Sequence, residues 1–305
     1  MNRYATIDIG SNTILLLVGT VTPQRTLEVV LDIEETTRLG KGLQNKGVLD
    51  PHSVRRSITV MKRFVSICRR ERVKEIAAIG TNPLRVASDT KEFIELVKNE
   101  CGISVRVITG KEEAYLSFLT VERDPFMPRD ALVMDVGGGS TEYIFRQESS
   151  LLHLLESISL PLGAVSLTEK FLSTDPPSYS ELEKLEKEIK KNLNRLPPTI
   201  GGEVVVIGGT AVTLGSIYLA LEEFDRKKIH GLQLSIDDIR AQLRALQSKN
   251  LADRKKIKGL PQKRADIILA GAMIILLSMQ RLGRGTIYIS CHGLRYGLFY
   301  QRFIS

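Results

Sequence analysis

The chain has 305 residues, 43% hydrophobic and 26% charged, a composition that excludes a mainly disordered or fibrous protein. At roughly 100 to 200 residues per domain, this length predicts two domains. The 43 Lys and Arg residues exceed the 35 Asp and Glu residues, giving a net charge of +8. This excess favours an anionic partner, whether a phosphorylated substrate, a nucleic acid or an anionic lipid.

The cysteines and the apolar segments indicate the compartment. Cys68, Cys101 and Cys291 lie far apart and form no CxxC pair, which argues against a disulfide framework or a structural zinc site and fits a reducing cytosol. The N-terminus lacks the apolar stretch of a signal peptide. The longest apolar run, residues 267–277, is too short to span a bilayer. We therefore expect a soluble, cytoplasmic protein with no membrane partner.

The first part of the chain alternates strands and helices. Asp50-Pro51 predicts a helix start, because Asp is a good N-cap and Pro suits the first helical position. Val54, Ile58, Met61, Val65 and Cys68 then recur at helical spacing. The predicted strands are residues 4–9, 14–21, 27–33, 75–79 and 103–108, and the other predicted helices are residues 89–99 and 111–122.

The same order of elements begins again after a break at residues 123–128. The predicted strands are residues 131–136, 141–146, 151–160, 203–207 and 286–290, and the predicted helices are residues 164–172, 180–195, 236–246 and 265–282, with one helix after Gly208-Gly209-Thr210 and one from Leu294. The order βββ-α-β-α-β-α, given twice, predicts two duplicated α/β domains with mixed sheets. We place them at residues 1–125 and 126–305, and the last helix could pack back on the first domain.

A sequence repeat supports this duplication. YATIDIGSNT (residues 4–13) aligns with ALVMDVGGGS (residues 131–140), 127 residues further on. The alignment places Asp8 on Asp135 and Gly10 on Gly137. Each copy is an apolar strand, an Asp-x-Gly sequence and a turn of small residues.

Three turns of small residues are candidates for phosphate binding, because such turns expose successive backbone N–H groups to an anion. The third also lies at a helix N-terminus, where the dipole favours an anion. Asp8 and Asp135 precede two of these turns and would repel phosphate unless a cation lay between, which indicates Mg²⁺. The candidate substrate-binding residues are Gly10, Ser11, Asn12, Gly137, Gly138, Gly139, Ser140, Thr141, Gly208, Gly209 and Thr210.

An ordered set of motifs resembles the exopolyphosphatase and guanosine pentaphosphate phosphohydrolase family. The motifs are DIGSNT (8–13), GTNPLR (80–85), GKEEA (110–114), DVGGGSTE (135–142) and IGGT (207–210). The family belongs to the superfamily of acetate kinase, sugar kinases, chaperone ATPases and actin. The resemblance covers nearly the whole chain and implies two actin-like (ribonuclease H-like) domains with an interdomain cleft, in a short form without further helical domains.

The resemblance also implies roles for individual residues. Glu113 matches the glutamate that activates the attacking water, and Arg85 and Asn82 match positions that contact substrate. Asp135, Glu142 and Asp8 match acidic positions that hold Mg²⁺. Without the resemblance, Glu112 and Glu113 would be ordinary helix-start acids, Arg85 a surface arginine and Glu142 a solvated strand residue.

The chain departs from the family pattern at several positions. Tyr115 stands where arginine is common, and Cys291 and Tyr296 replace two acids of the motif near the C-terminus. These departures put in question the pocket of the second domain and its preference for metal or nucleotide. We expect Cys291 to pack in the core, and we expect the same of His230 and His292 because they lack metal-ligand spacing.

Residues 249–264 hold seven bases and one acid, Asp253. The segment is either a solvated face or a track for a long polyanion, and without an aromatic-interleaved RNA motif nucleic acid is the weaker candidate. The bases are Lys249, Arg254, Lys255, Lys256, Lys258, Lys263 and Arg264.

The resemblance and the motifs together predict a Mg²⁺-dependent exopolyphosphatase that removes terminal phosphate from inorganic polyphosphate. Hydrolysis of the 5′-γ-phosphate of pppGpp is the first alternative. A kinase or ATPase of the superfamily, and a non-catalytic sensor of polyphosphate or pppGpp, are further alternatives. The sequence leaves open the chain-length preference, the metal and a homodimer.

Overall fold

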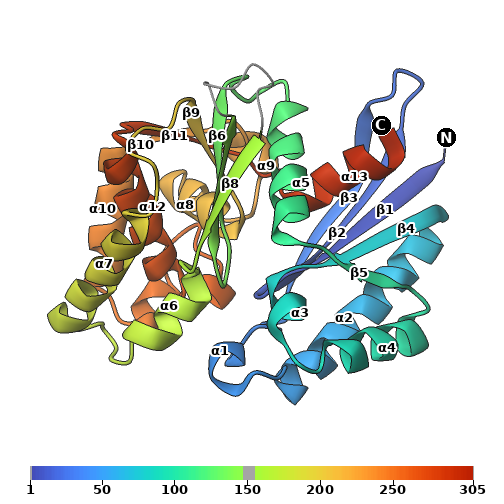
Figure 1. Cartoon of the computed structure of the whole chain (residues 1–305), viewed down its shortest axis with the longest axis horizontal. Helices are drawn as coiled ribbons and strands as arrows, with labels where there is room; N and C mark the ends of the chain where they lie inside the picture. Colours follow the sequence, from blue (N-terminus) through green and yellow to red (C-terminus); the bar gives the residue numbers. More distant parts are fainter. Residues whose placement is uncertain (1, 147–154, 305) are drawn as a thin grey trace. The chain divides into compact units, whose positions relative to one another are not determined.

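The computed structural model describes residues 2–146 and 155–304, which form two compact units (Figure 1). The first unit is Met1–Thr120 with Leu294–Ser305, so the C-terminal helix belongs to it. The second unit is Val121–Gly293. Among the described residues, every helix is too short or too polar to cross a membrane.

The first unit is built on a five-stranded mixed sheet in the order β3-β2-β1-β4-β5. The first three strands form an antiparallel meander, and β4 and β5 run parallel to β1. Its elements are β1 (Arg3–Ile9), β2 (Thr13–Val21), β3 (Leu27–Thr36), α1 (Leu43–Lys46), α2 (Pro51–Arg70), β4 (Val73–Gly80), α3 (Asn82–Val86), α4 (Thr90–Cys101), β5 (Val105–Val107), α5 (Gly110–Glu122), α13 (Leu294–Phe299) and the π-helix η2 (Tyr300–Ile304).

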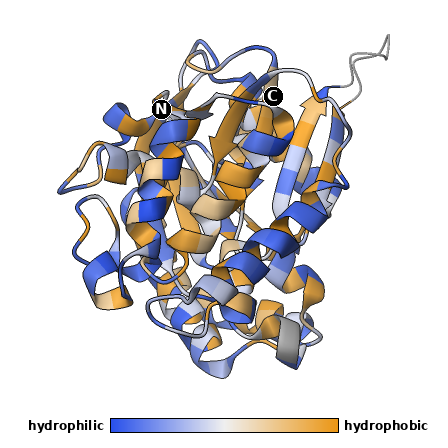
Figure 2. Ribbon diagram, turned by 90° about the vertical axis from the view of Figure 1, so that its left-hand side faces the viewer, coloured by the Kyte–Doolittle hydropathy of each residue, from blue (hydrophilic) through white to orange (hydrophobic). Residues whose placement is uncertain are grey.

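Helix α2 begins where the sequence predicts. The Asp50 side chain accepts the N–H of Ser53 (2.9 Å), which satisfies one donor of the first turn. The predicted apolar face is buried from Ile58 to Cys68. Figure 2 shows helices in which hydrophilic and hydrophobic residues alternate along the length, as in helices that cover a sheet with one face.

The short helix α3 follows β4 directly and is absent from the sequence-based prediction. It carries Asn82 and Arg85, which are both half-buried. Pro83 in its first turn is the available signal, because proline is tolerated there. The N–H of Thr81 donates to the carbonyl of Ile9 (3.2 Å), which holds the start of α3 beside the end of β1.

The C-terminal helix α13 packs on β1 in the first unit and is fixed there by a buried charge cluster. Arg295 donates two hydrogen bonds of 2.8 Å to the Asp32 carboxylate, and the Tyr296 hydroxyl donates a third of 2.7 Å. Tyr296 belongs to the first unit, so its departure from the family motif does not bear on the pocket of the second domain. A phenol here binds Asp32, which an acid at the same position would repel.

The second unit is built on a six-stranded mixed sheet in the order β10-β11-β9-β6-β7-β8. Of the predicted strand at residues 151–160, β8 forms the second part, and residues 151–154 lie outside the described residues. The elements are β6 (Ala131–Val136), β7 (Thr141–Arg146), β8 (Leu155–Leu160), α6 (Ala164–Phe171), α7 (Tyr179–Leu193), β9 (Glu203–Ile207), α8 (Gly209–Tyr218), α9 (Arg226–Ile229), β10 (Gln233–Ser235), α10 (Ile236–Gln247), α11 (Leu251–Arg254), the 3₁₀ helix η1 (Gln262–Arg264), α12 (Ile268–Leu282) and β11 (Thr286–Ile289).

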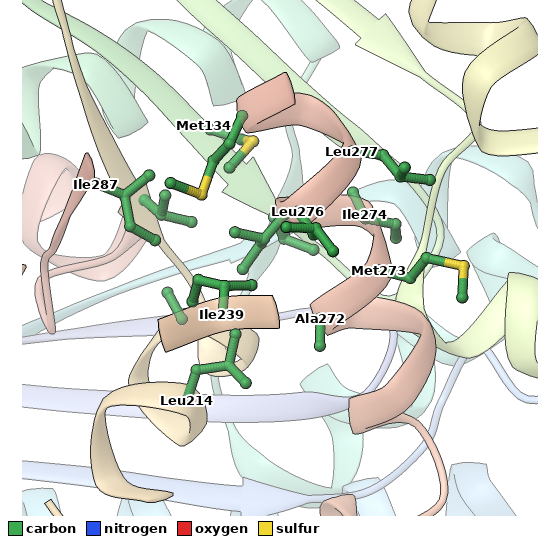
Figure 3. Packing of buried hydrophobic residues seen from close by; sticks show 14 of the residues in the cluster. Met134, Leu214, Ile239, Ala272, Met273, Ile274, Leu276, Leu277 and Ile287 are labelled. Carbon is green, nitrogen blue, oxygen red and sulfur yellow. The ribbon is translucent and has the colours of Figure 1, made fainter. Parts of the chain in front are cut away.

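Helix α12 forms the centre of this unit's core. It is buried from Ile268 to Met279 and packs against α6, α7, α8 and α10. Figure 3 shows its side chains among Met134 of β6, Leu214 of α8 and Ile239 of α10. The apolar run at residues 267–277, which is too short to span a bilayer, is therefore part of a core helix.

The two sheets confirm the predicted duplication. From β8, the second sheet runs β8-β7-β6-β9-β11, which matches β3-β2-β1-β4-β5 in order and in strand direction. The antiparallel edge strand β10 is an addition. The predicted α/β class with mixed sheets is confirmed.

Candidate active site

The turn between β1 and β2 carries the first predicted phosphate motif. The N–H of Gly10 donates to the carbonyl of Thr13 (3.0 Å), and a Cβ on Gly10 would lie only 3.2 Å from that oxygen. The carbonyl of Asn12 accepts the N–H groups of Thr37 and Arg38 at 3.0 and 2.9 Å. The turn is therefore tight and is fixed by the loop that follows β3.

Asp8 and Asn12 place buried polar atoms at this turn. Asp8 is 7% exposed, and among the described residues its Oδ1 accepts no hydrogen bond; the same holds for both polar atoms of the Asn12 side chain. Burial raises the pKa of Asp8 to about 7, the charge of Glu113 adds to this, and Arg295 opposes it. An ionised Asp8 therefore needs a cation, and its free oxygen can bind one.

Glu113 and Arg85 form a half-buried ion pair in the first unit. Arg85 Nη1 lies 2.5 Å from Glu113 Oε2 and also donates to the carbonyl of Ile108 (3.1 Å). Arg85 comes from α3 and Glu113 from the first turn of α5. Burial raises the pKa of Glu113 above its usual value, although Arg85 acts in the opposite direction. This carboxylate is therefore a stronger base than a solvated glutamate.

Glu112, the neighbouring acid, occupies a different environment. Its side chain is exposed, accepts the Thr109 N–H at 2.9 Å and pairs with Arg106 at 2.5 Å. The hydrogen bond from Thr109, followed by the contact with Arg106, lowers the pKa of Glu112. Of these two adjacent acids, Glu112 is thus the ordinary helix-start acid, and Glu113 is the one that forms an ion pair with Arg85.

The turn between β6 and β7 repeats the geometry of the first. The Gly137 N–H donates to the Ser140 carbonyl at 3.0 Å, the counterpart of the bond from Gly10 to Thr13. A Cβ on Gly137 would approach that carbonyl to 3.0 Å. The start of α6 donates to the carbonyls of Gly137 and Gly138, which fixes the turn on that side. Thr141 is fully buried, and its hydroxyl donates to a carbonyl at 2.5 Å.

Two acids face each other across the paired strands β6 and β7. Asp135 and Glu142 are direct partners in the register. Glu142 is buried, and its Oε1 accepts the hydroxyls of Ser140 (2.7 Å) and Ser159 (2.9 Å). Glu142 is therefore a fixed acid of the turn and differs from a solvated strand residue.

The third predicted motif joins β9 to α8 beside Asp135. Gly208 has φ +91°, and a Cβ there would lie 3.1 Å from Asp135 Oδ1. A Cβ on Gly209 would overlap the guanidinium of Arg264, which therefore lies over this helix start. Thr210 is buried against Gly271 of α12. The sequence analysis places Arg264 only in the basic run at residues 249–264. Its position over the start of α8 was not predicted, because no local pattern indicates it.

Arg254 differs from the other members of the basic segment. It is 4% exposed, pairs with Asp175 at 3.0 Å and donates to the Ala265 carbonyl at 3.3 Å. Neither alternative for the basic segment, a solvated face or a polyanion track, holds for Arg254, because it is buried and joins two segments of the second unit. Lys256 and Lys258 are exposed and remain candidates for the polyanion track.

Two histidines also differ from the prediction. We expected packing alone for His230 and His292, but their rings stack and each ring has a nitrogen 3.0 Å from the Asp124 carboxylate. Cys291 is buried as expected, and none of the three cysteines, all of which lie in the described part of the chain, forms a disulfide.

The sequence of this chain is similar to those of known proteins. A family model described as the Ppx/GppA phosphatase family matches residues 17–304. A bifunctional 3-dehydroquinate synthase/phosphatase of Fusobacterium nucleatum is 30% identical over 302 residues, covering 94% of this chain but 44% of that protein, so this chain spans less than half of that relative. Exopolyphosphatase 2 of Mycobacterium tuberculosis is 26% identical over 293 residues, covering 90% of this chain and 89% of that protein.

The structural comparison agrees. The crystal structure of the Aquifex aeolicus member of the Ppx/GppA family matches with a TM-score of 0.82 and 30% identity, covering 98% of this chain and 97% of that one. The expected actin-like α/β fold is confirmed by this match.

Proposed function

Because this chain belongs to the Ppx/GppA phosphatase family, we propose that it is an exopolyphosphatase that releases orthophosphate stepwise from the end of inorganic polyphosphate. The chain is a hydrolase of phosphoanhydride bonds. The proposal rests on the half-buried carboxylate of Glu113, which pairs with Arg85 and whose pKa is raised by desolvation.

Glu113 acts as the general base. It accepts a proton from the attacking water, the water oxygen bonds to the terminal phosphorus, and the bond from that phosphorus to the bridging oxygen breaks. The products are orthophosphate and a chain one phosphate shorter. Arg85 orients the Glu113 carboxylate through Nη1, which leaves the other nitrogens of its planar guanidinium for phosphate oxygens.

The acidic residues fit a divalent cation. In the first unit, Asp8 has a buried oxygen that accepts no hydrogen bond from the described residues; in the second unit, Asp135 and Glu142 are carboxylates beside the turn at Gly137. Carboxylate oxygens of this kind suit Mg²⁺. When bound, such a cation neutralises phosphate charge and polarises the phosphoryl group. The turns at Gly10 and Gly137 would bind the phosphate oxygens.

The test compares phosphate release from long polyphosphate, pppGpp and ATP, each with Mg²⁺ and with EDTA. The wild type should act fastest on polyphosphate and lose activity in EDTA. Glu113→Gln should lower kcat by roughly 10²- to 10⁴-fold with little change in KM, because it removes a general base. The matched control Glu112→Gln should remain near wild type.

Other outcomes contradict separate parts of the proposal. Faster release from pppGpp would make the chain a pppGpp phosphohydrolase, and faster release from ATP would favour an ATPase. Binding of polyphosphate without turnover would favour a sensor. If Glu112→Gln abolishes turnover while Glu113→Gln retains it, the base is assigned to the wrong carboxylate.

A further inference from the structure

Three side chains from separate segments of the second unit converge on one point. Asp124 follows α5, His230 follows α9, and His292 follows β11. Asp124 Oδ2 lies 3.0 Å from His230 Nε2 and 3.0 Å from His292 Nδ1. The Asp124 side chain is 1% exposed, while His230 and His292 are 11% and 19% exposed. The cluster is thus buried on one side and reaches solvent through its histidines.

These distances are close to the spacing of metal ligands. With bonds of about 2.1 Å, two ligands at the tetrahedral angle that zinc prefers lie about 3.4 Å apart, so atoms 3.0 Å apart need to separate by only a few tenths of an ångström. One potential ligand atom from each residue lies within 4.8 Å of the other two. Two imidazoles and one carboxylate form a set that suits a first-row transition metal, whereas Mg²⁺ prefers oxygen ligands alone.

The surroundings hold two of these side chains in position. Asp124 Oδ1 accepts the N–H of Phe126 at 3.0 Å, which leaves Oδ2 directed to the histidines. The Phe126 ring meets the His230 ring edge-on at 5.9 Å. The rings of His230 and His292 stack with centroids 4.2 Å apart. Outer contacts of this kind orient metal ligands.

A hydrogen-bond network without metal is the competing explanation. His230 Nε2 and His292 Nδ1 both lie at a hydrogen-bond distance from Asp124 Oδ2, yet among the described residues neither Asp124 Oδ2 nor His230 Nε2 makes a well-formed hydrogen bond. A buried polar pair of this kind is unfavourable unless another group satisfies it.

We propose that Asp124, His230 and His292 form a zinc site, separate from the acidic residues that we assign to the divalent cation of the phosphatase reaction. Water on the exposed side would complete the coordination. Asp124 lies four residues into the second unit and His292 next to its end. Zinc would therefore join the segments by which the chain enters and leaves this unit, and stabilise it.

The protonation of His230 gives the proposal a specific signature. Its Nδ1 accepts the Cys291 N–H at 3.3 Å, a long contact that requires the proton of a neutral ring to be on Nε2. A metal ion on Nε2 requires that proton to move to Nδ1. Zinc binding should then break the hydrogen bond from Cys291 and shift its amide resonance.

The test uses the full chain after chelation, in buffer with excess Mg²⁺ to saturate the oxygen sites. Zinc titrated by calorimetry should bind with a stoichiometry of one and raise the unfolding temperature. His292→Ala should weaken binding roughly 100-fold or more, since loss of even an outer contact weakens a site by about 10- to 100-fold. Asp124→Asn, which keeps the side-chain size, should weaken it similarly.

His52→Ala is the matched control, because His52 is exposed on α2 in the first unit. Zinc affinity should be unchanged in this variant. The proposal is overturned if the wild type binds no zinc, or if His292→Ala and Asp124→Asn bind it as tightly as His52→Ala. A Cys291 amide resonance that stays in place on zinc loading would overturn coordination through His230 Nε2. None of these readouts depends on phosphate release, so failure here is distinct from failure of the proposed function.

Discussion

Replacing Asp8 by Asn should make the protein more stable at neutral pH and less responsive to Mg²⁺. Asp8 lies near the end of β1, buried, with Oδ1 unpartnered among the described residues. Its neighbour Glu113 adds negative charge to the same region. An uncharged amide of the same size removes the buried charge and also removes a cation ligand.

The magnitude follows from the pKa. Burial and the charge of Glu113 raise the pKa of Asp8 from 3.8 to about 7. Each pKa unit corresponds to about 1.36 kcal/mol, so the ionised carboxylate destabilises the folded state by roughly 4 kcal/mol at pH 8. Between the two pKa values the folded state binds more protons than the unfolded state, so wild-type stability falls as pH rises from about 4 to 7. Asp8→Asn should lack this slope.

The assay is the free energy of unfolding against pH, measured in EDTA and in excess Mg²⁺. In EDTA, the variant should be more stable than the wild type at pH 8 and equally stable below about pH 4. Mg²⁺ at 100 times its dissociation constant should stabilise the wild type by about 2.7 kcal/mol, and should stabilise the variant much less. Asp237→Asn is the control, because Asp237 is 81% exposed and pairs only at the surface with Arg240.

Two results would refute this reasoning. A variant less stable than the wild type at pH 8 in EDTA would mean that Asp8 has a stabilising partner when ionised. Equal stabilisation of both proteins by Mg²⁺ would remove Asp8 from the cation site.

Three further predictions concern the second unit. Asp135→Asn should move the Mg²⁺ activation curve for phosphate release to higher concentration, and an unchanged curve would exclude Asp135 as a ligand. Gly208→Ala should lower the free energy of unfolding by about 1–3 kcal/mol, because φ +91° is strained for alanine, and a chemical denaturation curve at the wild-type midpoint would contradict this. Joint replacement of Lys255, Lys256 and Lys258 by Ala should raise KM for long polyphosphate more than for short chains, because released counterions favour long-chain binding; equal changes would indicate a solvated face.

The sequence by itself determined the elements of the fold and their duplication. Local signals were sufficient, because apolar periodicity, the Asp50 cap and the small-residue turns each act within a few residues. The paired Asp-x-Gly motifs also predicted two equivalent turns, and the bonds from Gly10 and Gly137 have the same geometry. The short elements α1, α3, α9, β10 and α11 were exceptions, since three to five residues offer too little periodicity.

Only the tertiary structure decided which side chains meet. Glu112 and Glu113 are adjacent in sequence, yet packing buries one against Arg85, 28 residues away, and leaves the other exposed. Tyr296 bonds to Asp32 across 264 residues.

The same holds for the charged and polar groups that the sequence analysis placed wrongly. Arg254 is buried and pairs with Asp175, 79 residues away. Two histidines 62 residues apart stack beside Asp124. The physical reason is that backbone pattern is a local property, whereas the burial and charge environment of a side chain depend on segments that chain folding brings together from distant positions.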